Sequence, residues 1–382
     1  MNNNPQLSLD RIWKPLLILT LLFFGLTQTS DIIVPLVFSL FFAILLNPIV
    51  TFLEEKGMNS ILAIVLSLVF ISLALSGIIF YVSIQAKNLI VDLPGLISKF
   101  NTFIDDLAQR FNGIYGYSTE DQINLLKQNA DKIISSGSSI LTNALSATSN
   151  VITFISLIPI YVFFFLLYRS NFKKFLSRLS ERNNTDFLNL AGEVNAMVHS
   201  YIIGLLIVIT IIAVLNTVGL LALGIKYAVF LGILSAALTV IPYIGIFIGA
   251  FLPVIVALIT KDSLFYPLGV IAIFGFVQFL EGNFITPNII GSKVNVNPMA
   301  AIVALIIGGK IWGIAGMILA IPICGILKIL FSHYPRLKPY AILLQSTNKD
   351  DEEKSLEELK EKVRKRKMKK QKQEEKKTEE AN

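Results

Sequence analysis

The stretch Val270–Pro287 reads VIAIFGFVQFLEGNFITP, and it places the carboxylate of Glu281 inside an apolar run. A charged side chain at the centre of a membrane-spanning helix costs about 2.5 kcal/mol or more. Such residues are therefore rare, and they usually face a bundle interior or a water-filled path. Gln278 and Asn283 add amide groups beside this carboxylate. These three residues are the first candidates for a polar site within a membrane.

The rest of the chain is also apolar, with 54% hydrophobic and 15% charged residues among 382. The apolar residues come in runs of about twenty, the length that a helix needs to cross a bilayer. The runs are too long and too uniform for barrel strands, and a helix satisfies its own backbone hydrogen bonds in lipid. We predict an all-α, polytopic transmembrane bundle with about seven to eight membrane segments, two of them broken or re-entrant. The other runs lie at 13–28, 32–53, 60–84, 151–168, 200–223, 227–260 and 299–332.

Polar composition divides the chain into four predicted parts. These are three transmembrane helices in 1–86, a helical insertion in 87–150, further helices and broken segments in 151–335, and a charged tail in 336–382. A basic linker follows the run at 151–168, and such density marks the cytoplasmic side of a membrane. Both termini are therefore predicted to be cytoplasmic and the amphipathic insertion extracytoplasmic. The tail is either a solvated arm or an element that binds anionic lipid.

Two apolar stretches are too long for one ordinary crossing, and each is interrupted. Pro242, Tyr243 and Gly245 break 227–260, whereas Gly308–Gly313 breaks 299–332. Each stretch is either a hairpin or one long broken helix. Paired broken segments are typical of a transporter binding site, because unwound backbone exposes polar groups at membrane depth. Against this stands the frequency of glycine and proline in ordinary membrane helices.

Two further polar residues belong to the candidate path. Lys310 is either the exposed tip of a hairpin or, in a single span, a buried cation that needs Glu281 as its partner. Asn216 lies in the run at 200–223 and either lines the path or forms an interhelical hydrogen bond. Glu281 itself is either a group that exchanges a proton or cation with an ion gradient, or a carboxylate that reaches the membrane interface.

Several function classes are not supported by the sequence. Cys324 is the single cysteine, which excludes an internal disulfide, and His199 and His333 lie too far apart to suggest a metal site. The phosphate-binding G-x-x-x-x-G-K-[ST] motif and the common hydrolase motifs are missing from the sequence. We therefore predict no cofactor, no metal, no enzymatic activity and no direct use of ATP. The net charge of +7 lies largely in the tail and does not indicate a nucleic-acid partner.

The order of small and helix-breaking motifs resembles the autoinducer-2 exporter (AI-2E) family of bacterial membrane permeases. The resemblance covers about 10–335 and departs from the family pattern at Leu205, Ile246 and Phe247. The matching motifs are Asn47-Pro48, Leu53–Gly57, Ile241–Gly245, Gln278–Asn283, Thr286-Pro287, Ile290-Gly291, Asn297-Pro298, Gly308-Gly309, Gly313–Gly316 and Ala320–Pro322.

This resemblance implies an exporter in the cytoplasmic (inner) membrane that forms a homo-oligomer, for example a pentamer. Its solute would be small and polar, such as autoinducer-2, with or without coupling to H⁺ or Na⁺. A sodium/proton antiporter, a passive channel and a non-transporting scaffold for envelope assembly are the alternatives. Membrane lipids are expected partners in each case.

Overall fold

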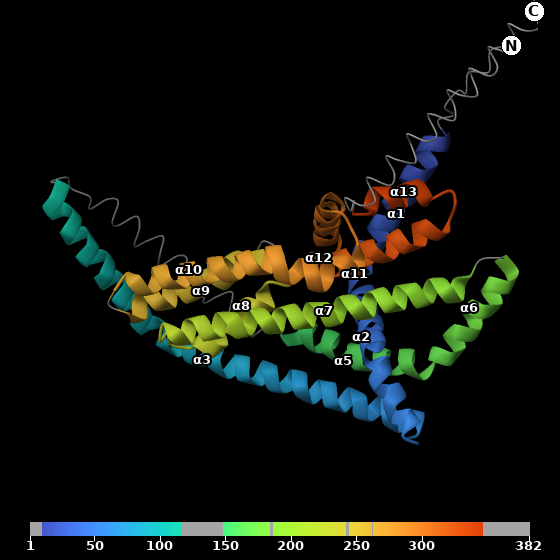
Figure 1. Cartoon of the computed structure of the whole chain (residues 1–382), viewed down its shortest axis with the longest axis horizontal. Helices are drawn as coiled ribbons and strands as arrows, with labels where there is room; N and C mark the ends of the chain where they lie inside the picture. Colours follow the sequence, from blue (N-terminus) through green and yellow to red (C-terminus); the bar gives the residue numbers. More distant parts are fainter. Residues whose placement is uncertain (1–9, 116–147, 184–185, 242–243, 262, 347–382) are drawn as a thin grey trace, which may run out of the picture.

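A computed structural model describes residues 10–115, 148–183, 186–241, 244–261 and 263–346 of the chain, and this part is almost entirely helical (Figure 1). The elements, in chain order, are α1 (Asp10–Gln28), α2 (Ser30–Glu55), α3 (Ser60–Tyr115), α5 (Thr148–Leu167), α6 (Arg169–Asn183), α7 (Phe187–Ala222), α8 (Ala228–Leu238), α9 (Ile244–Thr260), α10 (Phe265–Leu280), the π-helical segments η1 (Glu281–Ile285) and η2 (Pro287–Gly291), α11 (Ser292–Val294), α12 (Pro298–His333) and α13 (Lys338–Leu344).

Five helical segments among the described residues are long and apolar enough to cross a membrane. The prediction of a helical membrane protein is therefore confirmed, whereas the number of segments and the side on which the insertion lies stay predictions. Large apolar side chains point outward along these helices, and Phe70 and Leu73, for example, are 69% and 67% exposed. The five segments are Ser30–Glu55, Ser60–Asp92, Phe187–Ala222, Phe265–Gly291 and Pro298–His333, and the last of them reaches this length only as the sum of two arms that meet at Trp312 and Gly313.

Two helices are longer than the sequence suggests. The boundary expected between residues 86 and 87 falls inside α3, which continues through Pro94 to Tyr115. Helix α7 begins at Phe187, ahead of the apolar run at 200–223, and continues through this run as one helix of 36 residues. Its buried face is continuous from Leu190 to Leu220, so no break separates the two parts. Residues 116–147 of the predicted helical insertion lie outside the described residues.

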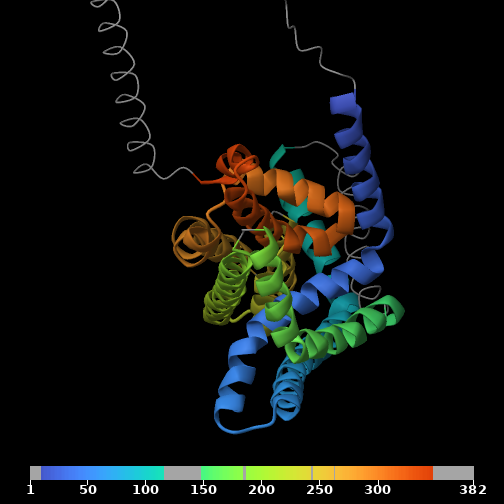
Figure 2. The same ribbon diagram turned by 90° about the vertical axis from the view of Figure 1, so that its right-hand side faces the viewer.

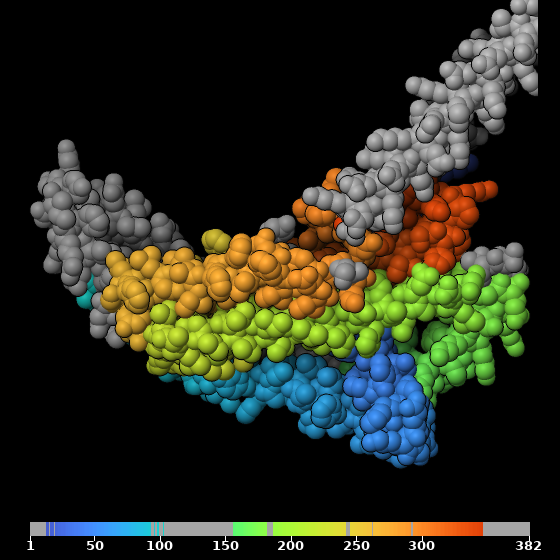
Figure 3. Space-filling model, viewed as in Figure 1, coloured from blue at the N-terminus to red at the C-terminus, as the bar shows by residue number. Residues whose placement is uncertain are grey.

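The helices that carry the candidate residues pack around α7. In Figure 1 α7 runs along the centre, with α9 and α10 on one side and α3 on the other, and Figure 3 shows α7 and α10 as adjacent bands on one face. Helix α2 crosses α7 within its length, where Phe41 packs with Val198 and Tyr201, and Figure 2 shows α2 inclined to the group. A core with fully buried Leu220, Phe230, Val256 and Val270 joins α7, α8, α9 and α10. These four helices form a fixed frame for a site between them.

The stretch at 227–260 is a helical hairpin, since α8 and α9 fold back on each other. The Ser235 hydroxyl donates to the Gly249 carbonyl oxygen at 2.6 Å, although fourteen positions separate the two residues. A Cβ atom on Gly245 would lie 1.6 Å from the Leu238 carbonyl oxygen. Glycine is therefore required where the arms meet.

The stretch at 299–332 is also a hairpin, because α12 reverses direction within its length. Gly313 has φ of +58°, a conformation that favours glycine. A Cβ atom on Gly316 would lie 1.9 Å from the Gly308 oxygen, whereas residues eight apart in a straight helix are separated by about 12 Å. The arm formed by 298–311 is about 21 Å long, which is shorter than the roughly 30 Å hydrocarbon core.

Candidate functional site

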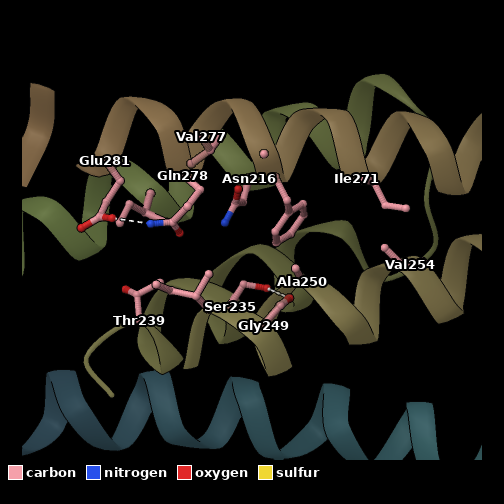
Figure 4. A pocket seen from close by; sticks show the side chains of 14 residues that line it. Asn216, Ser235, Thr239, Gly249, Ala250, Val254, Ile271, Val277, Gln278 and Glu281 are labelled. Carbon is pink, nitrogen blue, oxygen red and sulfur yellow. Dashed lines mark hydrogen bonds between the residues drawn. The ribbon is translucent and has the colours of Figure 1, made fainter. Parts of the chain in front are cut away.

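A cavity of about 270 Å³ lies between α7, the α8–α9 hairpin and α10 (Figure 4). Most of its wall is apolar, and polar side chains enter it from three of these helices. A cavity of this size suits a small solute. The polar residues are Asn216 on α7, Ser235 on α8, Thr239 at the end of α8, Gln278 on α10, and Glu281 where α10 passes into η1.

Glu281 is partly buried, and both of its carboxylate oxygens accept a hydrogen bond. Gln278 Nε2 donates to Oε2 at 2.6 Å, and Thr286 Oγ1 donates to Oε1 at 2.5 Å. No cation of the described residues forms a salt bridge with this carboxylate. Neutral donors therefore stabilise the charge, and its position at the cavity wall leaves it able to meet a proton, a cation or a solute.

Asn216 is 3% exposed, and its Oδ1 atom has no hydrogen-bond partner. Buried polar atoms almost always have a partner, because an unsatisfied one costs about 1 to 3 kcal/mol. Figure 4 shows the amide of Asn216 with its nitrogen toward the cavity and its oxygen turned away from Ser235 and Thr239 on the hairpin. The oxygen that lacks a partner is therefore buried just behind the wall of the cavity.

The two hydroxyls of the hairpin use their donors on the backbone. Ser235 Oγ lies 2.6 Å from the carbonyl oxygens of both Leu231 and Gly249, and Thr239 Oγ1 lies 2.7 Å from that of Ala236. Their lone pairs stay available as acceptors. The sequence analysis missed both residues, because single hydroxyl residues are common in apolar helices and carry no motif.

The predicted site residues separate into those that line the cavity and those that do not. Glu281, Gln278 and Asn216 come together at the cavity. Asn283 lies on the outward side of η1, where its Nδ2 donates to the Phe279 carbonyl oxygen at 2.9 Å.

The remaining candidates do not line the cavity among the described residues. Gly245 is buried at the contact between α8 and α9, where it closes the hairpin. Lys310 is exposed near the turn of α12 and forms no salt bridge with a described residue, as expected for a hairpin tip. Pro242 and Tyr243 lie outside the described residues.

Ionic contacts elsewhere hold the helix ends together. Arg169, at the start of α6, pairs with Glu54 and donates to Asn47 Oδ1 at 3.1 Å, which connects it to α2. Lys226, in the loop before α8, pairs with Asp92 of α3, and this hydrogen bond raises the pKa of the lysine ammonium. These contacts join α6 to α2 and the start of α8 to α3, and they lie outside the cavity lining.

The long apolar helices, the two hairpins and a cavity with a few polar side chains define a multi-pass helical membrane protein. A family model described as "AI-2E family transporter" matches residues 16–336, and the chain belongs to this family. The expectation from the sequence motifs is thereby confirmed.

Relatives match along most of their length. Two proteins of Bacillus subtilis (strain 168), each named "Putative transport protein" and called YrrI and YueF, are 30% identical to this chain over 86% and 84% of it. Each match covers 92% of the relative. The AI-2 transport protein TqsA of Escherichia coli (strain K12) is 26% identical over 87% of this chain and 94% of its own length.

Proposed function

We propose that this permease is a secondary transporter that exports a small polar solute through the cavity between α7, the α8–α9 hairpin and α10. The observation that carries the proposal is the buried Asn216 amide, whose oxygen has no partner at a wall that also holds Glu281. A solute hydroxyl would accept from the amide nitrogen in this position, and it would donate to the oxygen once the amide turns over toward the cavity, because a hydroxyl both donates and accepts. Autoinducer-2 is the first solute to test, since TqsA is named for its transport.

The same cavity offers a means of coupling transport to an ion gradient. Glu281 is the acidic residue of the lining, and its oxygens are held by Gln278 and Thr286. Binding of H⁺ or Na⁺ would change the charge that a solute meets at this end of the cavity. We infer that Glu281 alternates between ion-bound and free states during a cycle.

We expect the residue at the position of Ile246 to affect which solutes this chain and its relatives accept. The family pattern often places a proline just after the Pro-Tyr-x-Gly turn, at the site of Ile246 or Phe247 in this chain. The structure places Ile246 in the cavity lining and leaves Phe247 77% exposed. A branched apolar side chain at the wall therefore limits the solutes that fit here.

Efflux from proteoliposomes tests the proposal. The purified chain is reconstituted, the vesicles are loaded with autoinducer-2, and release is followed with and without an imposed H⁺ or Na⁺ gradient. Glu281→Gln keeps the shape of the side chain and removes its charge, so we expect gradient-driven efflux to fall by about tenfold or more. Equal efflux by wild type and Glu281→Gln would show that the carboxylate has no role.

A sodium/proton antiporter is the second candidate, and one observation favours it. The carboxylate of Glu281 has no cationic partner among the described residues, so it is free to bind an ion without an organic solute. Acidification of the vesicle lumen after a Na⁺ jump, followed with a pH-sensitive dye, would indicate exchange. Exchange in vesicles that release no solute would favour the antiporter over the exporter.

We also propose that the chain lies in the cell membrane with both termini in the cytoplasm and with 87–150 facing outward. The exposed Lys173, Lys174 and Arg178 of α6 support this orientation, because basic residues beside spans favour the cytoplasmic side. Labelling of single cysteines in intact cells, at 174 and at 125, would test it. Cross-linking of the full chain in membranes would test the other two predictions. Products that contain only this chain would support a homo-oligomer, and products with other envelope proteins would support a scaffold.

A further inference from the structure

Glu281 marks the place where a regular α-helix changes into a wider one. Helix α10 ends at Leu280, and η1 and η2 continue the chain as π-helical turns with Thr286 between them. A π-helix bonds each N–H to the fifth carbonyl before it, and π-bulges are frequent at functional sites. Accordingly, the Thr286 N–H donates to the Glu281 carbonyl oxygen.

The sequence of this segment repeats every five residues. Phe279-Leu280-Glu281-Gly282-Asn283 is followed by Phe284-Ile285-Thr286-Pro287-Asn288, so both blocks begin with phenylalanine and end with asparagine. Residues five apart point about 50° apart in a π-helix of about 4.4 residues per turn, whereas in an α-helix they point about 140° apart. A repeat of five therefore keeps equivalent side chains on one face in a π-helix and not in an α-helix.

Side chains five apart form the same contacts in both blocks. The rings of Phe279 and Phe284 lie edge to face, with centroids 5.9 Å apart. The Asn283 and Asn288 amides donate to the carbonyl oxygens of Phe279 and Phe284, at 2.9 and 2.8 Å respectively. The two amides and the two rings therefore repeat the same contacts on the outward face of the widened turns.

The inward face carries the third pair of the repeat, Glu281 and Thr286. We propose that Thr286 is a positioning residue that holds the Glu281 carboxylate at the cavity, and that the five-residue repeat exists to bring it there. In an α-helix the Thr286 hydroxyl would point away from Glu281, and the 2.5 Å hydrogen bond to Oε1 would be lost. Pro287 supports the wider turn because it has no N–H to continue an α-helix.

With Gln278 on one side and Thr286 on the other, each carboxylate oxygen has one fixed donor. The carboxylate thereby stays in one orientation toward the cavity instead of rotating toward lipid. This inference rests on the proposed role of Glu281 in transport. Its test distinguishes a failure of that role from a failure of the positioning by Thr286.

The test compares Thr286→Val, which removes the hydroxyl at nearly constant shape, with Thr286→Ser, which keeps it. We expect Thr286→Val to lower gradient-driven efflux by about tenfold and Thr286→Ser to stay within about twofold. In a Glu281→Gln background, Thr286→Val should add no further loss, because a residue that acts through Glu281 has nothing left to position.

An infrared measurement gives a readout that does not depend on transport. Subtracting the spectrum of Glu281→Gln isolates the carboxylate stretch of Glu281, which should shift in Thr286→Val and stay in place in Thr286→Ser. An unchanged band in Thr286→Val, or an equal loss of efflux with and without Glu281, would overturn the inference. If Glu281→Gln transports normally, Glu281 has no role in transport. The infrared band would still show whether Thr286 donates a hydrogen bond to the Glu281 carboxylate.

Discussion

The two hairpins, α8–α9 and α12, share a backbone design and differ in what they present. Both are closed by glycines that leave no room for a side chain, at Gly245 and at Gly308 with Gly316. Only α8–α9 contributes to the described cavity, through residues such as Ser235 and Thr239. A hairpin in the membrane therefore does not by itself make a solute site. The polar side chains that it carries decide whether it contributes to one.

The α12 hairpin is instead fixed to its neighbours. Trp312 Nε1, at the turn, donates to the Leu26 carbonyl oxygen of α1 at 2.9 Å. On the second arm, Leu319 packs with Phe41 of α2 and Val198 of α7. Its described contacts indicate a supporting element, which makes the comparison testable by substitution in either hairpin.

The largest effect is expected where the two hairpins are alike. Gly245→Ala and Gly316→Ala each place a methyl group within 2 Å of a backbone oxygen. The arms must separate, so we expect each variant to lose about 3 kcal/mol or more of unfolding free energy, or to fail to fold. Thermal unfolding in detergent measures this loss. Gly77→Ala is the control, because no atom lies within 4 Å of the added group, and a Gly316→Ala protein that melts like this control would exclude contact between the α12 arms.

A smaller effect of opposite sign is expected for Asn216→Leu. The variant removes a buried amide whose oxygen has no partner, so unfolding free energy should rise or stay constant, by up to about 1 kcal/mol. Efflux should nevertheless fall by about tenfold or more, because the solute loses its polar contact. Thr210→Val on the same helix is the control, since its exposed hydroxyl bonds only Leu206 of its own helix. Loss of stability together with activity would show that Asn216 is structural.

Ser235→Ala tests how the α8–α9 hairpin is held. The Gly249 carbonyl oxygen loses its hydroxyl donor in a buried position, so we expect about 1 to 2 kcal/mol of destabilisation. Thr260→Val serves for comparison, because its hydroxyl bonds only Val256 within α9. Equal melting temperatures for the two variants would contradict a role of Ser235 in joining the arms.

The smallest effect is expected for Lys310→Ala at the tip of α12. The side chain is exposed and pairs with no acidic residue of the described chain, so stability should change by less than about 0.5 kcal/mol and efflux should not change. Loss of efflux in Lys310→Ala that is restored in Lys310→Arg would instead show that transport needs a cation at this tip. That result would give the α12 hairpin a role in transport and would contradict its description as a supporting element.

Much of the fold follows from apolar runs, since α2, α5 and α10 lie where those runs predict helices. The sequence does not decide the reversals between α8 and α9 and at 312–313, because glycine and proline permit either a bend or a kinked span. The apolar pattern also does not predict that α3 and α7 are each one continuous helix. Polar residues such as Asp92 interrupt an apolar pattern without interrupting the helix.

The site was predicted where charge or amide groups stand out in an apolar run, as at Glu281, Gln278 and Asn216. Asn283 was included by sequence proximity, yet residues two apart do not share a helix face. Thr286 could have been found from the five-residue repeat, whose period differs from that of an α-helix. Ser235 and Thr239 could not, because only the tertiary fold of the hairpin brings them to Asn216.

The central claim is that the cavity lies on the path of the solute, and cysteine accessibility at Thr239 tests it most directly. Cys324 is the single cysteine of the chain, so Cys324→Ser gives a background without thiols. In that background a charged, membrane-impermeant thiol reagent should modify Thr239→Cys and block efflux, and added solute should slow the modification. Phe276→Cys, on an outward position of α10 that is 61% exposed, should stay unmodified in lipid. Modification at 239 no faster than at 276 would contradict a water-accessible path through this cavity.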